Sequence, residues 1–127
     1  MARRTYRVVE LRGGKLPKSV RTVVNAIDDR KGVNIQVLDL RHLSNAADFF
    51  IIASGTSDAH VRGLADGVMR AMLVDGNHTH GVEGLQTGRW VLIDFVDVVV
   101  HLFHPETRAF YQLERLWQDA PALLSGP

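Results

Sequence analysis

Hydrophobic residues recur at two spacings along the chain, and each spacing predicts a different kind of element. In Leu16–Arg30, three valines and an isoleucine stand at i, i+3, i+4 and i+7, which is typical of an amphipathic helix. Pro17 suits the first turn of that helix, and Gly32 suits the position just past its end. Val33–Leu38 instead alternates apolar and polar residues, which predicts a strand with one solvated face.

The middle of the chain predicts a buried strand followed by a second helix. Phe49–Ala53 is a continuous apolar run, as expected for a strand that is covered on both faces. The polar turn Ser54–Asp58 contains hydroxyl side chains that can cap the free amides of a helix. An apolar stripe at helical spacing then runs through residues 61–72, and Gly76 ends the helix.

The last third of the chain predicts a hairpin. A short strand is expected near His78–Val82, and Arg89–Phe95 and Val98–Phe103 form two further strands joined by a tight turn. Pro105 ends the last strand because it cannot donate to a ladder. Residues 106–117 predict a short terminal helix or two turns.

Together these segments predict one α/β (α+β) domain over residues 16–117. A strand-helix-strand crossover beside a hairpin implies a mixed β-sheet flanked by helices. Residues 1–15 are expected to form a flexible N-terminal arm, and residues 118–127 a flexible C-terminal tail. The basic N-terminal segment lacks the apolar core of a secretory signal, and no run reaches the roughly 18 apolar residues of a membrane span.

The composition is that of an ordinary globular domain, and it argues against several functions. The 127 residues are 46% hydrophobic and 23% charged, and 15 basic against 14 acidic residues give a net charge of +1. Such a balance argues against a protein that gathers nucleic acid by its own field. The absence of cysteine excludes disulfides and thiolate chemistry, and it is compatible with a cytoplasmic location.

The turn Ser54–Asp58 lies where backbone amides can hold an anion, and it resembles the Gly-Ser opening of nucleotidyltransferases. Those enzymes also need two carboxylates, one residue apart on the next strand, to hold metal ions. The acid at about that distance is Asp66, which lies on the predicted helix. Asp94 and Asp97 are three residues apart, so a strand would place them on opposite faces. We therefore interpret the turn as a capped helix start, with a degenerate nucleotidyltransferase-fold nucleotide-binding protein as the alternative.

The histidines do not form a recognisable metal motif. His78 and His80 can share one strand face, whereas His101 and His104 diverge on a strand. His101 lies within an apolar run, and we interpret it as a buried histidine with a hydrogen-bond partner. No Gly-x-Ser-x-Gly elbow or His-Glu-x-x-His motif is present, so the sequence predicts no catalytic residue, no metal ligand and no cofactor.

Trp90 calls for a different explanation. Alternate residues of its strand point to opposite faces, so Val91 points to one face while Trp90, Leu92 and Asp94 point to the other. If the Val91 face belongs to the core, Trp90 is accessible enough to bind a partner protein, as aromatic hot spots do. The alternative is that Trp90 packs under the terminal helix against Trp117. The residues alone leave both interpretations open.

Three segments carry a resemblance to a known family: DFFIIASGTSDAHVRGLADGV, GVEGLQTGRWVLIDFVDVVVHLFHP and RAFYQLERLW, and the resemblance covers roughly residues 17–117. They are similar to the Iojap family of ribosomal silencing factors. The family fold is nucleotidyltransferase-like without the catalytic acids, in agreement with the missing carboxylate pair. The resemblance implies a protein that is not an enzyme. It would bind ribosomal protein L-fourteen on the large subunit, block association of the two subunits and repress translation, notably under nutrient limitation.

The resemblance also implies where the partner binds and how. The partner-binding region would include the tryptophan that matches Trp90 and its neighbours, here Arg89, Leu92, Asp94, Phe95 and Asp97. Our hypothesis is steric occlusion, with Trp90 as the anchor, Leu92 as its flank, Asp94 as a polar contact or turn stabiliser, and Arg89 paired with partner acids. A homodimer is expected for the free protein. A direct RNA binder, and a scaffold whose Trp90 serves only the homodimer, are the rival hypotheses.

The chain departs from the family pattern at Val96, where the family usually has glycine. A glycine in a tight turn often supplies positive φ, and a β-branched residue resists that conformation. We therefore expect the turn at Val96 to have either a negative φ or a wider shape.

Overall fold

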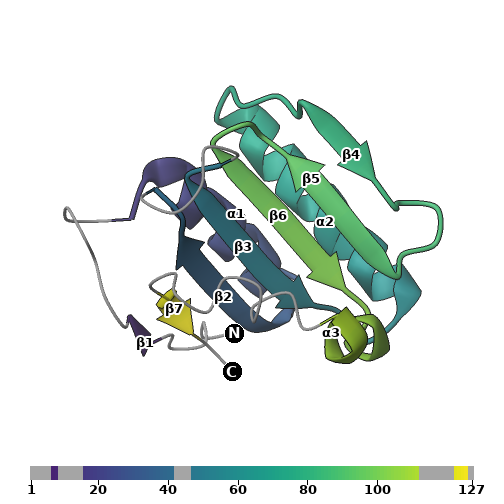
Figure 1. The fold of residues 1–127 in the computed structure, drawn as a ribbon. Helices are drawn as coiled ribbons and strands as arrows, with labels where there is room; N and C mark the ends of the chain where they lie inside the picture. Colours follow the sequence, from purple (N-terminus) through teal and green to yellow (C-terminus); the bar gives the residue numbers. More distant parts are fainter. Residues whose placement is uncertain (1–6, 9–15, 42–46, 112–121, 126–127) are drawn as a thin grey trace.

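The protein forms one mixed β-sheet with helices packed against it (Figure 1). The computed structural model describes residues 7–8, 16–41, 47–111 and 122–125. In chain order the elements are β1 (Arg7–Val8), α1 (Lys18–Asp29), β2 (Val33–Asp39), β3 (Phe49–Ser54), α2 (Asp58–Val74), β4 (Gly81–Glu83), β5 (Trp90–Asp94), β6 (Val98–Phe103), α3 (Pro105–Tyr111) and β7 (Ala122–Ser125).

The strands of the sheet run in the order β1-β7-β2-β3-β6-β5-β4. β3 and β6 are parallel neighbours, and the other pairs are antiparallel. The chain leaves β3 through α2, forms β4 and β5 at the far side of the sheet, and returns through the β5–β6 hairpin to lie beside β3. The predicted mixed sheet, with one crossover next to a hairpin, is confirmed.

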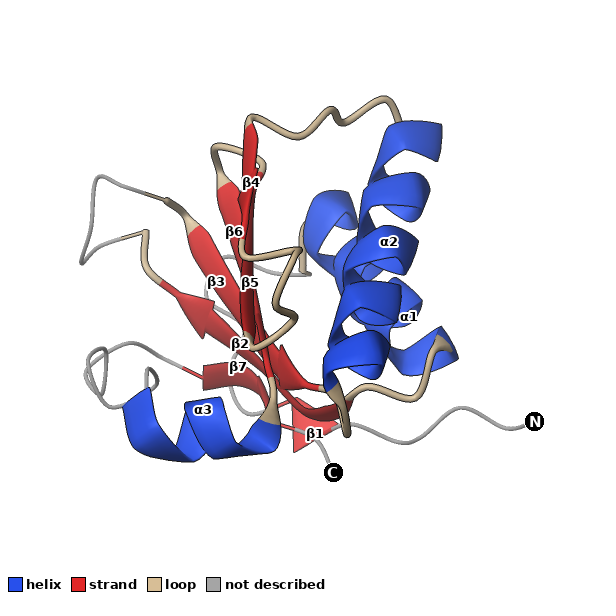
Figure 2. Ribbon diagram, turned by 90° about the vertical axis from the view of Figure 1, so that its right-hand side faces the viewer, coloured by secondary structure: helices blue, strands red, loops and turns tan. Residues whose placement is uncertain are grey.

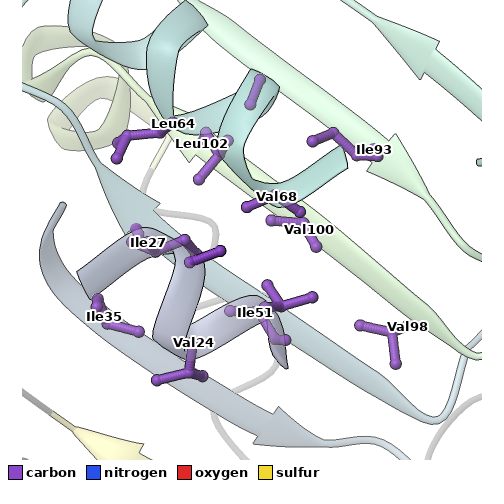
Figure 3. Close-up of a cluster of buried hydrophobic side chains, with 14 of the residues drawn as sticks. Val24, Ile27, Ile35, Ile51, Leu64, Val68, Ile93, Val98, Val100 and Leu102 are labelled. Atoms are coloured by element: carbon purple, nitrogen blue, oxygen red, sulfur yellow. The ribbon is translucent and has the colours of Figure 1, made fainter. Parts of the chain in front are cut away.

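The two faces of the sheet are covered differently (Figure 2). α1 and α2 lie on one face, and their apolar stripes meet the apolar side chains of β3, β5 and β6 in the main core (Figure 3). Val91, Ile93, Val100 and Leu102 of the sheet are fully buried in this core. α3 lies on the opposite side of the sheet, near one end of the strands. The opposite face has a smaller apolar cluster, formed by Leu38, Leu40, Phe50, Ile52, Trp90 and Phe103.

The start of α2 follows the expected capping chemistry. The Ser57 side chain accepts a hydrogen bond from the His60 backbone N–H at 3.0 Å, and Asp58 lies in the first turn, where the helix dipole favours a negative charge. At the other end, Gly76 takes a φ of +84°, as expected after a helix C-terminus. Among the described helices, none is both long and apolar enough to cross a membrane.

Two short strands lie in segments for which we expected chain ends without regular structure. β1 falls within residues 1–15 and β7 within residues 118–127, and β7 pairs with both β1 and β2. Strands of two and four residues are too short to show a periodic pattern, so the sequence could not distinguish them from a tail. The strand expected at His78–Val82 lies slightly later, at Gly81–Glu83. The later part of the predicted terminal helix, residues 112–117, lies outside the described residues.

Candidate functional site

The alternation of β5 presents Trp90, Leu92 and Asp94 on the sheet face opposite α1 and α2. Val91 and Ile93 are 0% exposed in the helix-covered core, whereas the other three residues of the strand are half-buried. The Val91 face is therefore the main core, which the interpretation of Trp90 as a partner-binding residue requires; Trp117, on which the other interpretation depends, lies outside the described residues. Trp90 also belongs to the smaller cluster on the other face, so it is neither fully exposed nor fully covered.

The strand register decides which residues surround Trp90. Its cross-strand partner on β6 is Phe103, and the two rings stack with centroids 5.0 Å apart. Leu92 stands opposite His101 on β6 and opposite Glu83 on β4. Directly opposed residues of antiparallel strands share a face. The five side chains therefore lie on one face of the sheet across β4, β5 and β6, with His101 and Phe103 buried, and we call it the Trp90 face.

The buried side chain of His101, on the neighbouring strand β6, contacts Trp90. The indole Nε1–H of Trp90 donates to Nδ1 of His101 at 3.2 Å, and the Phe50 ring lies 4.7 Å from the imidazole between centroids. His101 is 4% exposed, and burial lowers its pKa from 6.5 to about 4. The ring is therefore neutral near pH 7. The interpretation of His101 as a buried histidine with a hydrogen-bond partner is confirmed.

A depression opens beside the tryptophan. Glu83, Gly84, Trp90 and Leu92 line this hollow, which has a volume of about 290 Å³. Gly84 lets the chain lie close against β5 at this point, because its φ is +85° and a Cβ here would lie 2.0 Å from the Trp90 carbonyl oxygen. A residue with a side chain would push the turn away from β5.

Acidic groups border the Trp90 face without basic partners. Glu83 is exposed and Asp94 is half-buried on this face, and Asp97 is exposed in the hairpin turn beyond it. None of these three carboxylates forms an ion pair with a basic side chain in the described part of the chain. The face therefore combines an apolar centre with a negative margin.

The hairpin turn at Val96 contradicts our expectation. Val96 has a φ of +75°, and the Asp97 N–H donates to the Phe95 carbonyl at 3.0 Å, so the chain makes a tight γ-turn with positive φ. The expectation of a negative φ or a wider turn was therefore wrong. Two hydrogen bonds hold this conformation: Asp94 Oδ1 accepts from the Val96 N–H at 2.7 Å, and the Phe95 N–H donates to Val98. These bonds impose a conformation that the side chain alone resists.

The remaining predicted partner-binding residues have other surroundings. Arg89 forms ion pairs within the chain, with Glu106 at 3.0 Å and with Asp58 at 3.6 Å. Phe95 packs against the helix-covered core on the other side of the sheet. Asp97 uses its backbone carbonyl to accept from the N–H groups of Asp48 and Phe49. The structure therefore brings together Trp90, Leu92 and Asp94, but not Arg89 or Phe95.

Sequence reasoning missed the residues that complete the Trp90 face. Glu83, Gly84 and Phe103 lie on other strands or turns, and only the register joins them to Trp90. The alternation within β6 contained part of the signal, because His101 and Phe103 are two residues apart and share a face. Their pairing with β5 required the exact length of the hairpin turn.

The polar turn before α2 uses its groups locally. The Thr56 N–H donates to Nδ1 of His60 at 2.8 Å, and the Ser57 hydroxyl caps the helix. Asp66 lies on α2 and pairs with Arg70 at 2.8 Å and with Arg30 at 3.7 Å. The capped helix start is therefore present as expected. Within the described ranges, no three His, Asp or Glu side chains gather as metal ligands.

Comparisons with known proteins agree with this structure. The sequence profile of a family described as "Ribosomal silencing factor during starvation" matches residues 14–125. A protein of Halalkalibacterium halodurans called "Ribosomal silencing factor RsfS" is 43% identical over 100 residues, which is 79% of this chain and 86% of that protein. The protein of the same name in Bacillus subtilis is 42% identical over 96 residues, covering 76% of this chain and 81% of the relative.

A solved structure extends the likeness to three dimensions. The crystal structure of a Chromobacterium violaceum protein matches with a TM-score of 0.79 at 34% identity, covering 83% of this chain and 88% of that one. The profile match includes every strand of the Trp90 face. The family's name refers to ribosome silencing, which indicates regulation of translation in association with the ribosome. The chain belongs to the ribosomal silencing factor family.

Proposed function

We propose that the protein binds ribosomal protein L-fourteen on the large ribosomal subunit and so prevents the small subunit from joining. Family membership supports a role at the ribosome, and the observation that carries the proposal is the half-buried Trp90 beside an open depression. A half-buried tryptophan that is held by its neighbours and lines a hollow is typical of interface hot spots. Binding alone represses translation by steric occlusion, and no bond is made or broken.

The charge on the Trp90 face favours a protein partner over RNA. Glu83 and Asp94 carry negative charge on this face that no described basic side chain neutralises. Such a margin repels phosphates, and binding to RNA needs lysine or arginine at the contact. An apolar anchor with acids around it suits a protein surface that carries both apolar and basic groups.

The structure changes two of the roles that we expected. Arg89 already has acidic partners in its own chain, so its contribution is to hold the turn before β5 against α2 and α3. Asp94 stabilises the hairpin turn through the Val96 N–H, and this leaves Leu92 as the closest flank of the anchor. We further propose a cytoplasmic location and a homodimer for the free protein.

The alternative of a nucleotide-binding protein gains no support from the polar turn before α2. The Thr56 N–H of this turn donates to His60, and the Ser57 hydroxyl caps the helix. Calorimetry with nucleoside triphosphate and magnesium should therefore show no binding heat. A measurable heat would favour the nucleotide-binding function.

Trp90→Ala tests the proposed function directly. We expect the variant to lose about 2 kcal/mol or more of binding free energy for large subunits, because truncating a hot spot empties the centre of the interface. The measurement is co-sedimentation with separated large subunits, and then binding to purified L-fourteen. Thermal unfolding should show that the variant still folds.

Val74→Ala is a suitable control for that experiment. Val74 is 87% exposed and ends α2, which packs against the opposite face of the sheet. Its truncation should leave the affinity unchanged. Equal affinities of wild type and a folded Trp90→Ala variant would overturn the proposal.

A further inference from the structure

The histidine behind Trp90 is not explained by packing. His101 is 4% exposed, and its ring neighbours are Phe50, Trp90 and Phe103. A leucine or phenylalanine would fill such an apolar site without bringing a polar atom that needs a partner. A histidine at this position therefore indicates a role for one of its ring nitrogens.

The two nitrogens of His101 are in different states. Because the Trp90 indole N–H donates to Nδ1 at 3.2 Å, Nδ1 carries no hydrogen, and Nε2 carries the ring hydrogen of the neutral imidazole. Nε2 is buried and has no hydrogen-bond partner among the residues that the structure describes. A buried donor without an acceptor destabilises a fold. The histidine thus lowers stability at this site, and what it provides is the bond to Trp90.

We propose that His101 is a positioning residue, whose Nδ1 holds the Trp90 indole in its binding orientation before the partner arrives. This inference rests on the proposed function, because it takes Trp90 as the anchor. The stack on Phe103 restrains the plane of the indole. The hydrogen bond is directional, so it also fixes which edge of the indole faces β6. A side chain that is already ordered loses less entropy on association.

Two variants of similar shape separate positioning from stability. In His101→Asn, the side-chain oxygen can take the place of Nδ1 as acceptor for the Trp90 N–H. His101→Leu has the same branched shape and no acceptor. We expect the leucine variant to bind large subunits roughly tenfold more weakly than wild type and the asparagine variant only about threefold more weakly.

Thermal stability should rank the two variants, His101→Asn and His101→Leu, in the opposite order to affinity. The buried amide of asparagine brings polar atoms that lack partners, so His101→Asn should melt at a lower temperature than His101→Leu. A merely structural role would make affinity follow stability. Higher affinity in the less stable variant is therefore the signature of positioning, and equal or reversed affinities would overturn it.

A spectroscopic measurement tests the bond without any partner. In the ¹⁵N-labelled free protein, an N–H···N bond transmits a scalar coupling between Trp90 Nε1 and His101 Nδ1. We expect this coupling in the wild type and its loss in His101→Leu. Absence of the coupling from the wild type would show that the hydrogen bond between Trp90 and His101 does not form. If the wild type shows the coupling but does not bind large subunits, the proposed function fails and the positioning role fails with it, although the bond itself stands.

Discussion

Trp90 is held by its neighbours on β6 and also lines a depression. Its ring stacks on Phe103, its N–H donates to His101, and Leu92 and Glu83 line the depression with it. A rigid aromatic ring in this setting offers a large contact area at a small entropic cost. The acids nearby act differently, because Asp94 stabilises the turn whereas Glu83 faces solvent.

The depressed pKa of His101 predicts a loss of stability in acid. The unfolded histidine takes up a proton near its ordinary pKa of 6.5, whereas the folded one does so only at about 4. The stability that depends on neutral His101 is complete above pH 6.5 and is lost as the pH falls towards 4. A shift of this size corresponds to about 3 kcal/mol. Urea denaturation at pH values between 6.5 and 4 measures this loss in the free energy of unfolding. We expect the loss to be smaller in His101→Phe than in the wild type by about 3 kcal/mol. The same pH dependence in both proteins would contradict the assignment to His101.

The positive φ of Val96 predicts a stabilising substitution. Val96→Gly removes a left-handed strain of about 1–2 kcal/mol, while the added freedom of the unfolded chain offsets about 0.4–1 kcal/mol of it. We expect a net gain of about 1 kcal/mol in the free energy of unfolding, measured with urea. Val74→Gly makes the same change at an exposed helical residue without positive φ and should give no gain. A destabilised Val96→Gly would show that the turn is not strained.

At the scale of elements, the period of β5 was the most reliable sequence signal. Strict alternation placed Val91 and Trp90 on opposite faces of the strand, but it left open which of the two faces belongs to the core. The turn at Val96 could not be predicted in this way, since its φ depends on hydrogen bonds to Asp94 and across the hairpin. The close approach of Gly84 to Trp90 is likewise tertiary, and nothing in the local sequence distinguishes it from Gly81.

Gly84 and Gly81 give a matched test of how the turn before β5 packs on that strand. Gly84→Ala places a methyl group against the Trp90 carbonyl and demands a φ of +85°, so we expect a loss of roughly 2 kcal/mol or more in stability. Gly81→Ala adds the same methyl group on β4 where nothing lies within 4 Å, and it should be nearly neutral. Thermal unfolding of the two variants measures the difference. Equal melting temperatures would contradict the proposed packing of the turn on β5.

At the scale of the whole molecule, α1 and α2 lie on one side of the sheet and the Trp90 face lies on the other. One side supplies the main core, so the other can carry a binding surface without loss of the fold. Family membership, shown by the profile over residues 14–125, connects this arrangement to the ribosome. Neither the core nor the net charge of +1 would have indicated that connection alone.

The central claim is that occupancy of the large subunit by this protein excludes the small subunit. The most direct measurement is light scattering of subunit association, with large subunits incubated first with wild-type protein or with Trp90→Ala. We predict that wild type lowers the joined fraction in proportion to the large subunits it occupies, and that Trp90→Ala at the same concentration leaves joining nearly unchanged. Undiminished joining of large subunits that demonstrably carry the wild-type protein would contradict the account.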